Sequence, residues 1–485
     1  MRLNFGEWKP DQPVLGYGDG EFYDAKNVFP AIHGYQPFKD ITEYSTALTA
    51  RCQGAFSLRD NSGTTATYAG DATKLYLLSS ATFNDASRLV GGAYATPSDN
   101  QWRFAKWGNT VIAVNGADAP QVITVGTANF AALGGTPPTA RHVGVVRDFV
   151  VMGNIVGAQN RIQWSSSNNS AAWATGVNEA NQQDIQDAGK VQAIIGGAVG
   201  YVFMERQIIR MIRSPSPVTF QIDVVESNRG ALAPYSVVAL GQNAIYLSQD
   251  GLYMFDGNQS VPLGAEKFDR TILAELNFSA LDRVTAAIDP YNKVYLMAYP
   301  TGSSTTPNKL LIYKWDTQRA SYAVLDIQIL MQLFPLGVTL EGLDAYSASI
   351  ETLTPSMDAA IWQGGQLTVG LFSMNNKLGF LTGSNLAATM TTQEVQPNPE
   401  GRAFVSEMVP LIDTTLATVA VATRQTQQAT ATYTSENSIA STGSIYTRAN
   451  GKYFRTRITT PYAAAWTYCQ GVDIPQSAIV SDGVR

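Results

Sequence analysis

The alternation of apolar and polar positions is clearest between residues 243 and 322. It forms two units: residues 243–264, NAIYLSQDGLYMFDGNQSVPLG, and the paired segments 289–300 and 309–322. In each unit an alternating run reaches a turn that carries Gly or Asn and resumes directly after it, which is typical of short antiparallel strands joined in a meander. The rest of the chain varies this unit.

Similar alternating segments precede and follow this stretch at a spacing of about 40 to 50 residues, the length of one four-stranded propeller blade. A β-sandwich would not need so many similar meanders in succession. We therefore predict an all-β chain with an irregular β-propeller of six or seven blades over residues 51–383. The related segments are 54–80, 102–125, 142–167, 191–214, 219–227 and 361–383.

The pattern changes after residue 383. Five segments alternate cleanly between apolar and polar residues, as strands of a half-exposed sheet do: 404–413, 417–425, 429–435, 453–461 and 466–475. We predict an additional antiparallel β-sandwich domain over residues 384–485, with a linker near 384–402. The turn-rich residues 1–50 have no repeat pattern, and we expect them to form an arm that packs on this C-terminal domain.

Helical periodicity is confined to residues 265–284, where Phe268, Ile272 and Leu276 recur at four-residue spacing. We expect this helix to span a gap between blades. The most apolar run, residues 327–338, is too short to cross a bilayer. It fits core or a subunit interface better than membrane contact.

Composition adds limits on chemistry. The net charge is −6 over 485 residues, without a Lys/Arg-rich block, so no footprint for gripping phosphates is predicted. Cys52 and Cys469 lie far apart and are expected to be free thiols. His33 and His142 are the only histidines, which disfavours histidine-dependent catalysis and zinc sites. With no signal peptide or transmembrane run visible, we expect folding in a cytoplasm.

One segment resembles a sialidase motif. In RIQWSSSNNSAAW, residues 161–173, Asn169 and Ala171 would replace the Asp and Gly of an Asp-box, with Trp173 one place early. The alternative interpretation is a strand followed by a polar turn, in which Trp164 and Trp173 pack between blades. The second interpretation is favoured.

Two acidic pairs, Asp250 with Asp256 and Asp289 with Asp316, could serve a glycosidase. All four lie in hairpin turns, where Asp commonly caps its own backbone, and we favour that role. GYGDGE, residues 16–21, lacks the flanking strand and helix of a dinucleotide site. We predict no catalytic, cofactor-binding or metal site and no enzyme activity.

Several segments together look like the tail nozzle proteins of short-tailed bacteriophages, also called phage stabilisation or tail tubular B-type proteins. In chain order they are GEWKPDQP, AKNVFPAIHGYQPF, RIQWSSSNNSAAW, LSQDGLYMFDG, LLIYKWDTQRASY, and NGKYFRTRITTP followed by GVDIP. The similarity covers nearly the whole chain.

The resemblance implies a structural virion protein assembled in the host cytoplasm. Six copies would form a homo-oligomeric ring at the distal end of the tail, bind the adaptor or tail-tube ring above it and continue the DNA channel. The ring would help to retain the packaged genome and take part in DNA ejection, without sequence-specific DNA binding. Contacts with tail fibres and the host envelope would follow from this position. The alternative is a virion propeller that hydrolyses or binds glycans.

Overall fold

The computed structural model describes residues 1–13, 21–215, 218–334, 367–399 and 401–482. These ranges are almost wholly β-structure, with one α-helix, α1 (Asp269–Glu275), and three single-turn or two-turn 3₁₀ helices, η1 (Pro234–Ser236), η2 (Phe278–Arg283) and η5 (Gln476–Ala478). Within them, no helix has the length and apolar character needed to cross a membrane.

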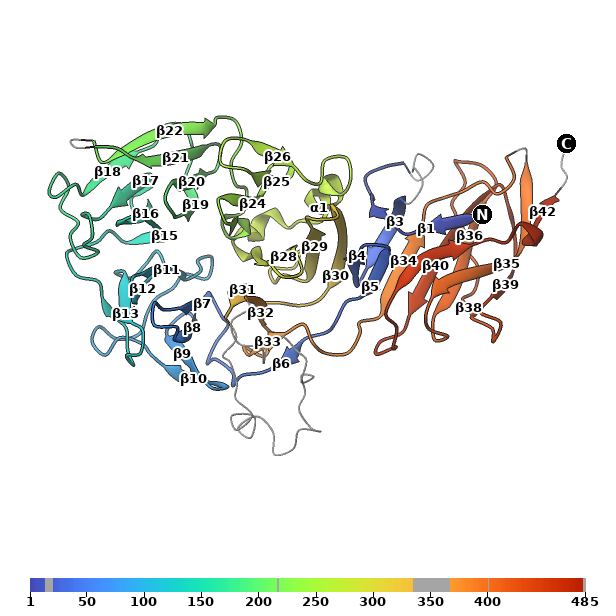
Figure 1. Cartoon of the computed structure of the whole chain (residues 1–485), viewed down its shortest axis with the longest axis horizontal. Helices are drawn as coiled ribbons and strands as arrows, with labels where there is room; N and C mark the ends of the chain where they lie inside the picture. The colour runs from blue at the N-terminus through green and yellow to red at the C-terminus, as the bar shows by residue number, and fades with distance from the viewer. Residues whose placement is uncertain (14–20, 216–217, 335–366, 400, 483–485) are drawn as a thin grey trace.

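A ring of four-stranded antiparallel sheets forms one end of the molecule (Figure 1). In the described residues, six sheets are separate and a seventh quartet, β27–β30, continues into a larger sheet. The predicted all-β propeller of six or seven blades is therefore confirmed. We number the blades by their innermost strands, β7, β11, β15, β19, β23, β27 and β31.

The first blade contains β7 (Ala55–Arg59), β8 (Thr65–Gly70), β9 (Leu75–Ser79) and β10 (Thr82–Asp85). The second contains β11 (Arg103–Trp107), β12 (Thr110–Val114), β13 (Gln121–Thr124) and β14 (Ala131–Ala132). The third contains β15 (Ala140–Val146), β16 (Phe149–Ile155), β17 (Ala158–Trp164) and β18 (Asn181–Asp184). The fourth blade contains β19 (Val191–Ile195), β20 (Gly200–Met204), β21 (Ile208–Arg213) and β22 (Phe220–Glu226). The fifth contains β23 (Val238–Leu240), β24 (Asn243–Ser248), β25 (Gly251–Phe255) and β26 (Ser260–Pro262). The sixth contains β27 (Thr285–Asp289), β28 (Val294–Tyr299), β29 (Lys309–Lys314) and β30 (Arg319–Val324). The stretch 243–322 thus supplies most of two neighbouring blades.

The seventh blade closes the ring with a strand from the beginning of the chain. Its strands are β31 (Ile329–Leu333), β32 (Thr368–Phe372), β33 (Leu378–Phe380) and, outermost, β6 (Thr42–Glu43). Phe380 pairs with Thr42, and the Glu43 carboxylate accepts hydrogen bonds from Ser373 and Asn375. This pairing ties both ends of the propeller segment together and covers an open sheet edge.

The described part of the apolar run 327–338 lies in this blade. Ile329, Leu330, Met331 and Leu333 of β31 are buried, so the described part of the run is propeller core. Residues 335–338 lie outside the described residues.

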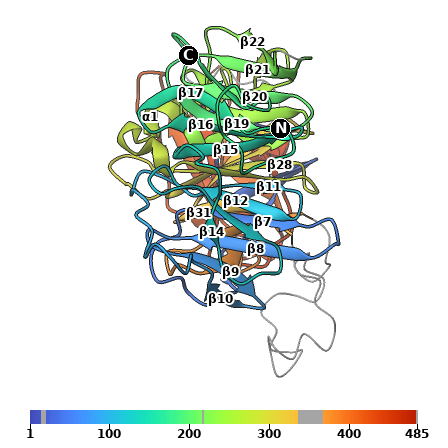
Figure 2. The ribbon, with the colours of Figure 1, turned by 90° about the vertical axis from the view of Figure 1, so that its left-hand side faces the viewer.

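A second, two-layered β-unit lies beside the propeller (Figure 1) and behind it when the propeller faces the viewer (Figure 2). One layer contains β1 (Arg2–Asn4), β4 (Val28–Ala31), β5 (Gly34–Pro37), β35 (Arg402–Ile412), β39 (Ile445–Gly451), β41 (Cys469–Asp473) and β42 (Ile479–Asp482). The other contains β2 (Glu7–Trp8), β3 (Glu21–Lys26), β34 (Ala388–Thr392), β36 (Thr418–Arg424), β37 (Thr432–Tyr433), β38 (Asn437–Ser438) and β40 (Tyr453–Thr460). The additional antiparallel sandwich is thus present, and it includes five N-terminal strands.

Two details of the expected organisation are wrong. The arm does not lie wholly on the C-terminal domain, because β6 completes the propeller. The expected linker at 384–402 contains β34, which pairs with β3 and β40. Glu394 follows β34, and its buried side chain forms ion pairs with Arg424 and Arg455.

The two units share one sheet and one core. β30 of the sixth blade pairs with β3 in parallel at Tyr322 and Lys26, which makes an eleven-stranded sheet. Trp8 stacks on Phe268 with ring centroids 5.8 Å apart and lies 5.3 Å from the Tyr322 ring. A single buried apolar cluster continues from the propeller into the second unit. The junction is therefore packed as an interior, which resists hinge motion.

The expected helix over 265–284 is interrupted. α1 ends at Glu275 and Leu276 is extended, after which η2 begins. The Asn277 side chain accepts a hydrogen bond from the backbone NH of Ser279 and so starts the new helix. Phe268, Ile272 and Leu276 are buried, as their spacing indicated.

Candidate functional site

The inner strands of the blades surround a central channel with a volume of about 680 Å³. Neighbouring inner strands run in the same direction, as the parallel bridge between Val146 and Gly197 shows for the third and fourth blades. All inner strands therefore begin at one end of the channel. In the middle of the lining the Phe56 and Phe104 rings stack with centroids 5.9 Å apart.

The charged groups of the channel lining have one sign. Its ionisable side chains in the described residues are Arg59, Arg103, Lys106 and His142, and no Asp or Glu is among the lining residues described. Arg59 and Lys106 lie where the inner strands end, with the Lys106 ammonium donating to the Arg59 carbonyl at 2.8 Å. Arg103 lies where they begin. A chain of net charge −6 thus carries a cationic channel.

Tyr235 reaches across the end at which the inner strands begin. It belongs to η1, before the fifth blade, and its buried hydroxyl accepts a hydrogen bond from the backbone NH of Gln101 at 2.9 Å. The Arg103 guanidinium lies over its ring at 4.6 Å, and the His142 ring is centred 6.0 Å away. Burial raises the pKa of the Tyr235 phenol. A neutral aromatic ring from the fifth blade therefore links the second and third blades.

His142 lies beside Tyr235 and is 2% exposed, and within the described part of the chain its imidazole has no hydrogen-bond partner. Burial lowers its pKa well below the ordinary value, and the nearby positive charges of Arg103, Arg141 and Lys190 lower it further. The imidazole is therefore neutral at neutral pH. In the sequence, His142 stands out only because histidine is scarce, and nothing there indicates a role for it.

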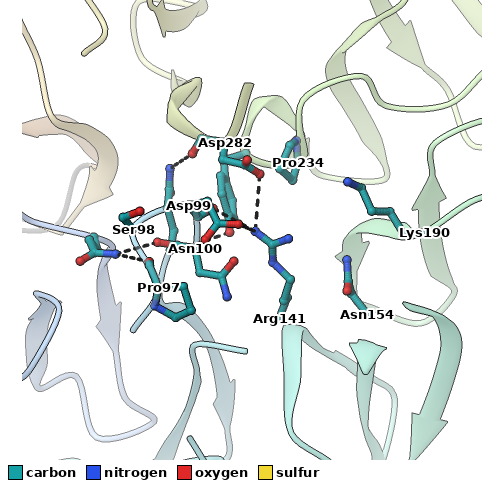
Figure 3. Close-up of polar contacts among 12 residues, drawn as sticks. Pro97, Ser98, Asp99, Asn100, Arg141, Asn154, Lys190, Pro234 and Asp282 are labelled. Atoms are coloured by element: carbon teal, nitrogen blue, oxygen red, sulfur yellow. Dashed lines mark hydrogen bonds and ion pairs between the residues drawn. The ribbon is translucent and has the colours of Figure 1, made fainter. Parts of the chain in front are cut away.

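A polar network surrounds this end of the channel (Figure 3). The Arg141 guanidinium donates to the Asp99 carbonyl at 2.9 Å and to the Asp282 carboxylate at 3.5 Å. Gln101 donates its side-chain amide to the Asp282 carbonyl at 3.2 Å. Burial raises the pKa of Asp282. Figure 3 shows Lys190 to the right of Arg141, on the side of the neighbouring blade.

The Asp-box-like segment begins in β17 and continues into the connection to β18, the outermost strand of the third blade, away from the channel. The Asn169 side chain accepts a hydrogen bond from the backbone NH of Ala171 at 3.0 Å, and Ser166 bridges to Asn169. Trp164 and Trp173 are buried. The structure thus has a strand followed by a polar turn that anchors two tryptophans.

The predicted capping of turn backbone holds for one residue of each acidic pair, Asp256 and Asp289, while Asp250 and Asp316 have side-chain partners. Asp256 accepts from backbone NH groups two and three residues further on, and so does Asp289. Asp250 accepts from the Tyr253 hydroxyl at 2.7 Å, and Asp316 lies 3.9 Å from a lysine ammonium. Each side chain has a local partner that accounts for it.

Other sequence candidates add no further chemistry. Cys52 and Cys469 are both free and buried. Burial raises the pKa of Cys52 to about 12 and also raises that of Cys469. The described ranges contain no group of three or more His, Cys, Asp or Glu placed to hold a metal ion. Most of GYGDGE, at residues 16–20, lies outside the described residues.

No protein-family model and no curated protein matches the chain. Among solved structures, the extracellular domain of BT4673 from B. thetaiotaomicron aligns over 77% of this chain with 12% identity and a TM-score of 0.44, and the match covers 44% of that chain. The WD40 domain of Pan2 from Neurospora crassa aligns over 71% of this chain and 98% of its own, with 7% identity and a TM-score of 0.40. BamB from Moraxella catarrhalis aligns over 62% and 87%, with 14% identity and a TM-score of 0.35. At these values the propeller assignment rests on the strand order.

Proposed function

We propose that the chain is a structural virion protein, the tail nozzle of a short-tailed phage, which assembles into a homo-oligomeric ring of six copies. In this role it binds the adaptor or tail-tube ring above it and continues the DNA channel. It also helps to retain the packaged genome until ejection. It works by shape and rigidity rather than by bond-making chemistry.

One observation carries the proposal: six of the seven segments that resemble the nozzle family contribute buried residues to the apolar cluster that crosses the junction of the two units. These residues include Trp8 and Tyr35 from the N-terminal segments, Tyr313 from the sixth blade, and Phe454 and Val472 from the C-terminal unit. The remaining segment, residues 161–173, packs within the third blade. Most of the resemblance therefore lies in segments that take part in fixing the two units relative to each other. A rigid two-part subunit suits a ring wall under internal pressure.

The assembly state of the purified chain tests the proposal, alone and mixed with a short-tailed phage adaptor ring. We expect ring-shaped particles in negative-stain images and a six-copy species in native mass spectrometry. A particle that stays monomeric at micromolar concentration, even with the adaptor present, would contradict the proposal. Turnover of a glycan panel would instead favour the alternative of a propeller glycan hydrolase.

A further inference from the structure

The central channel carries chemistry that is independent of any ring assembly. Two polar groups in it have no strong partner. His142 is buried without a hydrogen bond. Arg103 makes one long contact, to the Pro234 carbonyl at 3.4 Å, and none to a carboxylate in the described residues. Polar groups that line a cavity and lack a strong protein partner commonly take one from a ligand.

The guanidinium is held in position before any ligand arrives. It lies over the Tyr235 ring at 4.6 Å, and the Tyr235 hydroxyl is itself fixed by the backbone of Gln101. Stacking of this kind leaves the NH edge of the guanidinium free to donate two parallel hydrogen bonds to an oxyanion. The His142 ring is centred 6.0 Å from the same tyrosine ring and can donate a third.

The surroundings select an anion with an apolar body. The described lining carries no carboxylate to repel it, while Arg59 and Lys106 extend the positive potential to the far end. The stacked rings of Phe56 and Phe104 supply an apolar part of the same lining. The volume of about 680 Å³ is in the range of small-molecule sites. A neutral ligand would gain less from the guanidinium, because hydrogen bonds between two charged groups are stronger.

We propose that the propeller channel binds a small organic anion, whose carboxylate or phosphate group contacts Arg103 and His142 and whose apolar part lies against Phe56 and Phe104. The site belongs to each subunit singly. It would tie the second, third and first blades together across the channel when occupied.

Calorimetric titration of the full-length protein with benzoate, phenyl phosphate, inorganic phosphate and neutral benzamide, at constant ionic strength, tests this proposal. We expect saturable binding of benzoate or phenyl phosphate with one site per chain, at least tenfold weaker binding of inorganic phosphate, and no binding of benzamide. Equal affinity for benzamide, or no saturation with any of the anions, would overturn the proposal.

Variants separate this site from general surface binding. Arg103→Gln should lower the affinity for the anion at least tenfold, because it removes a charged pair of donors. Arg103→Lys should retain part of that affinity. Arg229→Gln is the matched control, since Arg229 also lies over a tyrosine ring, Tyr253 at 4.2 Å, but does not line the channel. Unfolding temperatures report whether each variant is folded. Unchanged affinity in a folded Arg103→Gln protein would rule out the site.

Discussion

The Asp11 carboxylate caps α1 through Thr271. One oxygen accepts from the backbone NH of Thr271 at 2.9 Å and from its hydroxyl at 2.6 Å, and the other accepts from the backbone NH of Arg270 at 2.8 Å. Phe268, at the N-cap position of the helix itself, provides no side-chain cap. A residue of the N-terminal arm therefore satisfies NH groups that begin a helix between the fifth and sixth blades.

Replacing this cap should loosen the junction. We expect Asp11→Ala to lower the free energy of unfolding by about 1–2 kcal/mol, because it leaves three donors without their acceptor. The measurement is thermal unfolding of this variant beside the matched control Asp60→Ala. In the native protein the Asp60 carboxylate caps only its own exposed turn. An equal shift of the unfolding temperature in both variants would show that the contact between arm and helix adds no stability beyond that of a local turn cap.

Asp269 should make stability depend on pH. Its side chain is packed so closely that a Cβ atom on Gly251 or Gly264 would lie 2.2 Å from a carboxylate oxygen. Burial raises its pKa from 3.8 to about 7. The folded state thus holds the proton more tightly than the unfolded chain, so this stabilisation is complete below about pH 4 and lost as the pH rises towards 7.

We therefore expect Asp269→Asn to unfold at a higher temperature than the native protein at pH 8, with the difference shrinking towards pH 4. The Asn oxygen can still accept from the Leu252 NH, which bonds Asp269 at 3.1 Å. Asp256→Asn should behave in the opposite way, because backbone hydrogen bonds lower the pKa of Asp256 and its contribution is lost as the pH falls. Parallel pH profiles for the two variants would contradict this explanation.

Glu394 holds two arginines inside the second unit. Its side chain is 1% exposed and pairs with Arg424 and, at 3.7 Å, with Arg455. Glu394→Gln should cost about 3–5 kcal/mol, because it leaves buried positive charge without a counter-ion. Glu436→Gln is the control: its pair with Arg457 is 44% exposed on the acid side and should be worth about 0–1 kcal/mol. Denaturant unfolding compares the two.

Tyr235→Phe should destabilise the propeller while keeping its shape. Loss of the hydroxyl leaves the buried Gln101 NH without its acceptor, at a cost of about 1–3 kcal/mol. Tyr253→Phe, which removes a hydroxyl bonded to Asp250 at a part-buried turn, should cost less. Hydrogen exchange at the Gln101 amide gives a local measurement, and unchanged protection there would contradict the role assigned to Tyr235.

The propeller could be predicted because most strands of a blade follow one another directly in the sequence. The strands between residues 243 and 322 alternate and turn within a few residues, so periodicity alone identifies them. β6 has only two residues, Thr42 and Glu43, and becomes a strand through pairing with β33. A contact between such distant segments leaves no periodic signal in either one.

Parts of the second unit escaped prediction for a related reason. β39 buries Ile445, Thr447, Ala449 and Gly451 on one face, a set too small and polar to read as an apolar alternation. The sequence around Glu394 has the composition of a linker, and only the arginines of β36 and β40 make it an interior position. The channel site was not predicted because Arg103, His142 and Tyr235 lie in three distant elements, β11, β15 and η1.

The interleaving of the chain ends sets the order of events during synthesis. The N-terminal strands β1, β3 and β5 pair with β41 and β34, which are synthesised much later, and β6 waits for β33. Most blades can form on the emerging chain, but these N-terminal strands stay without those partners until the later segments have been made. The emerging chain therefore passes through a stage with open strand edges, and folding chaperones would act at that stage.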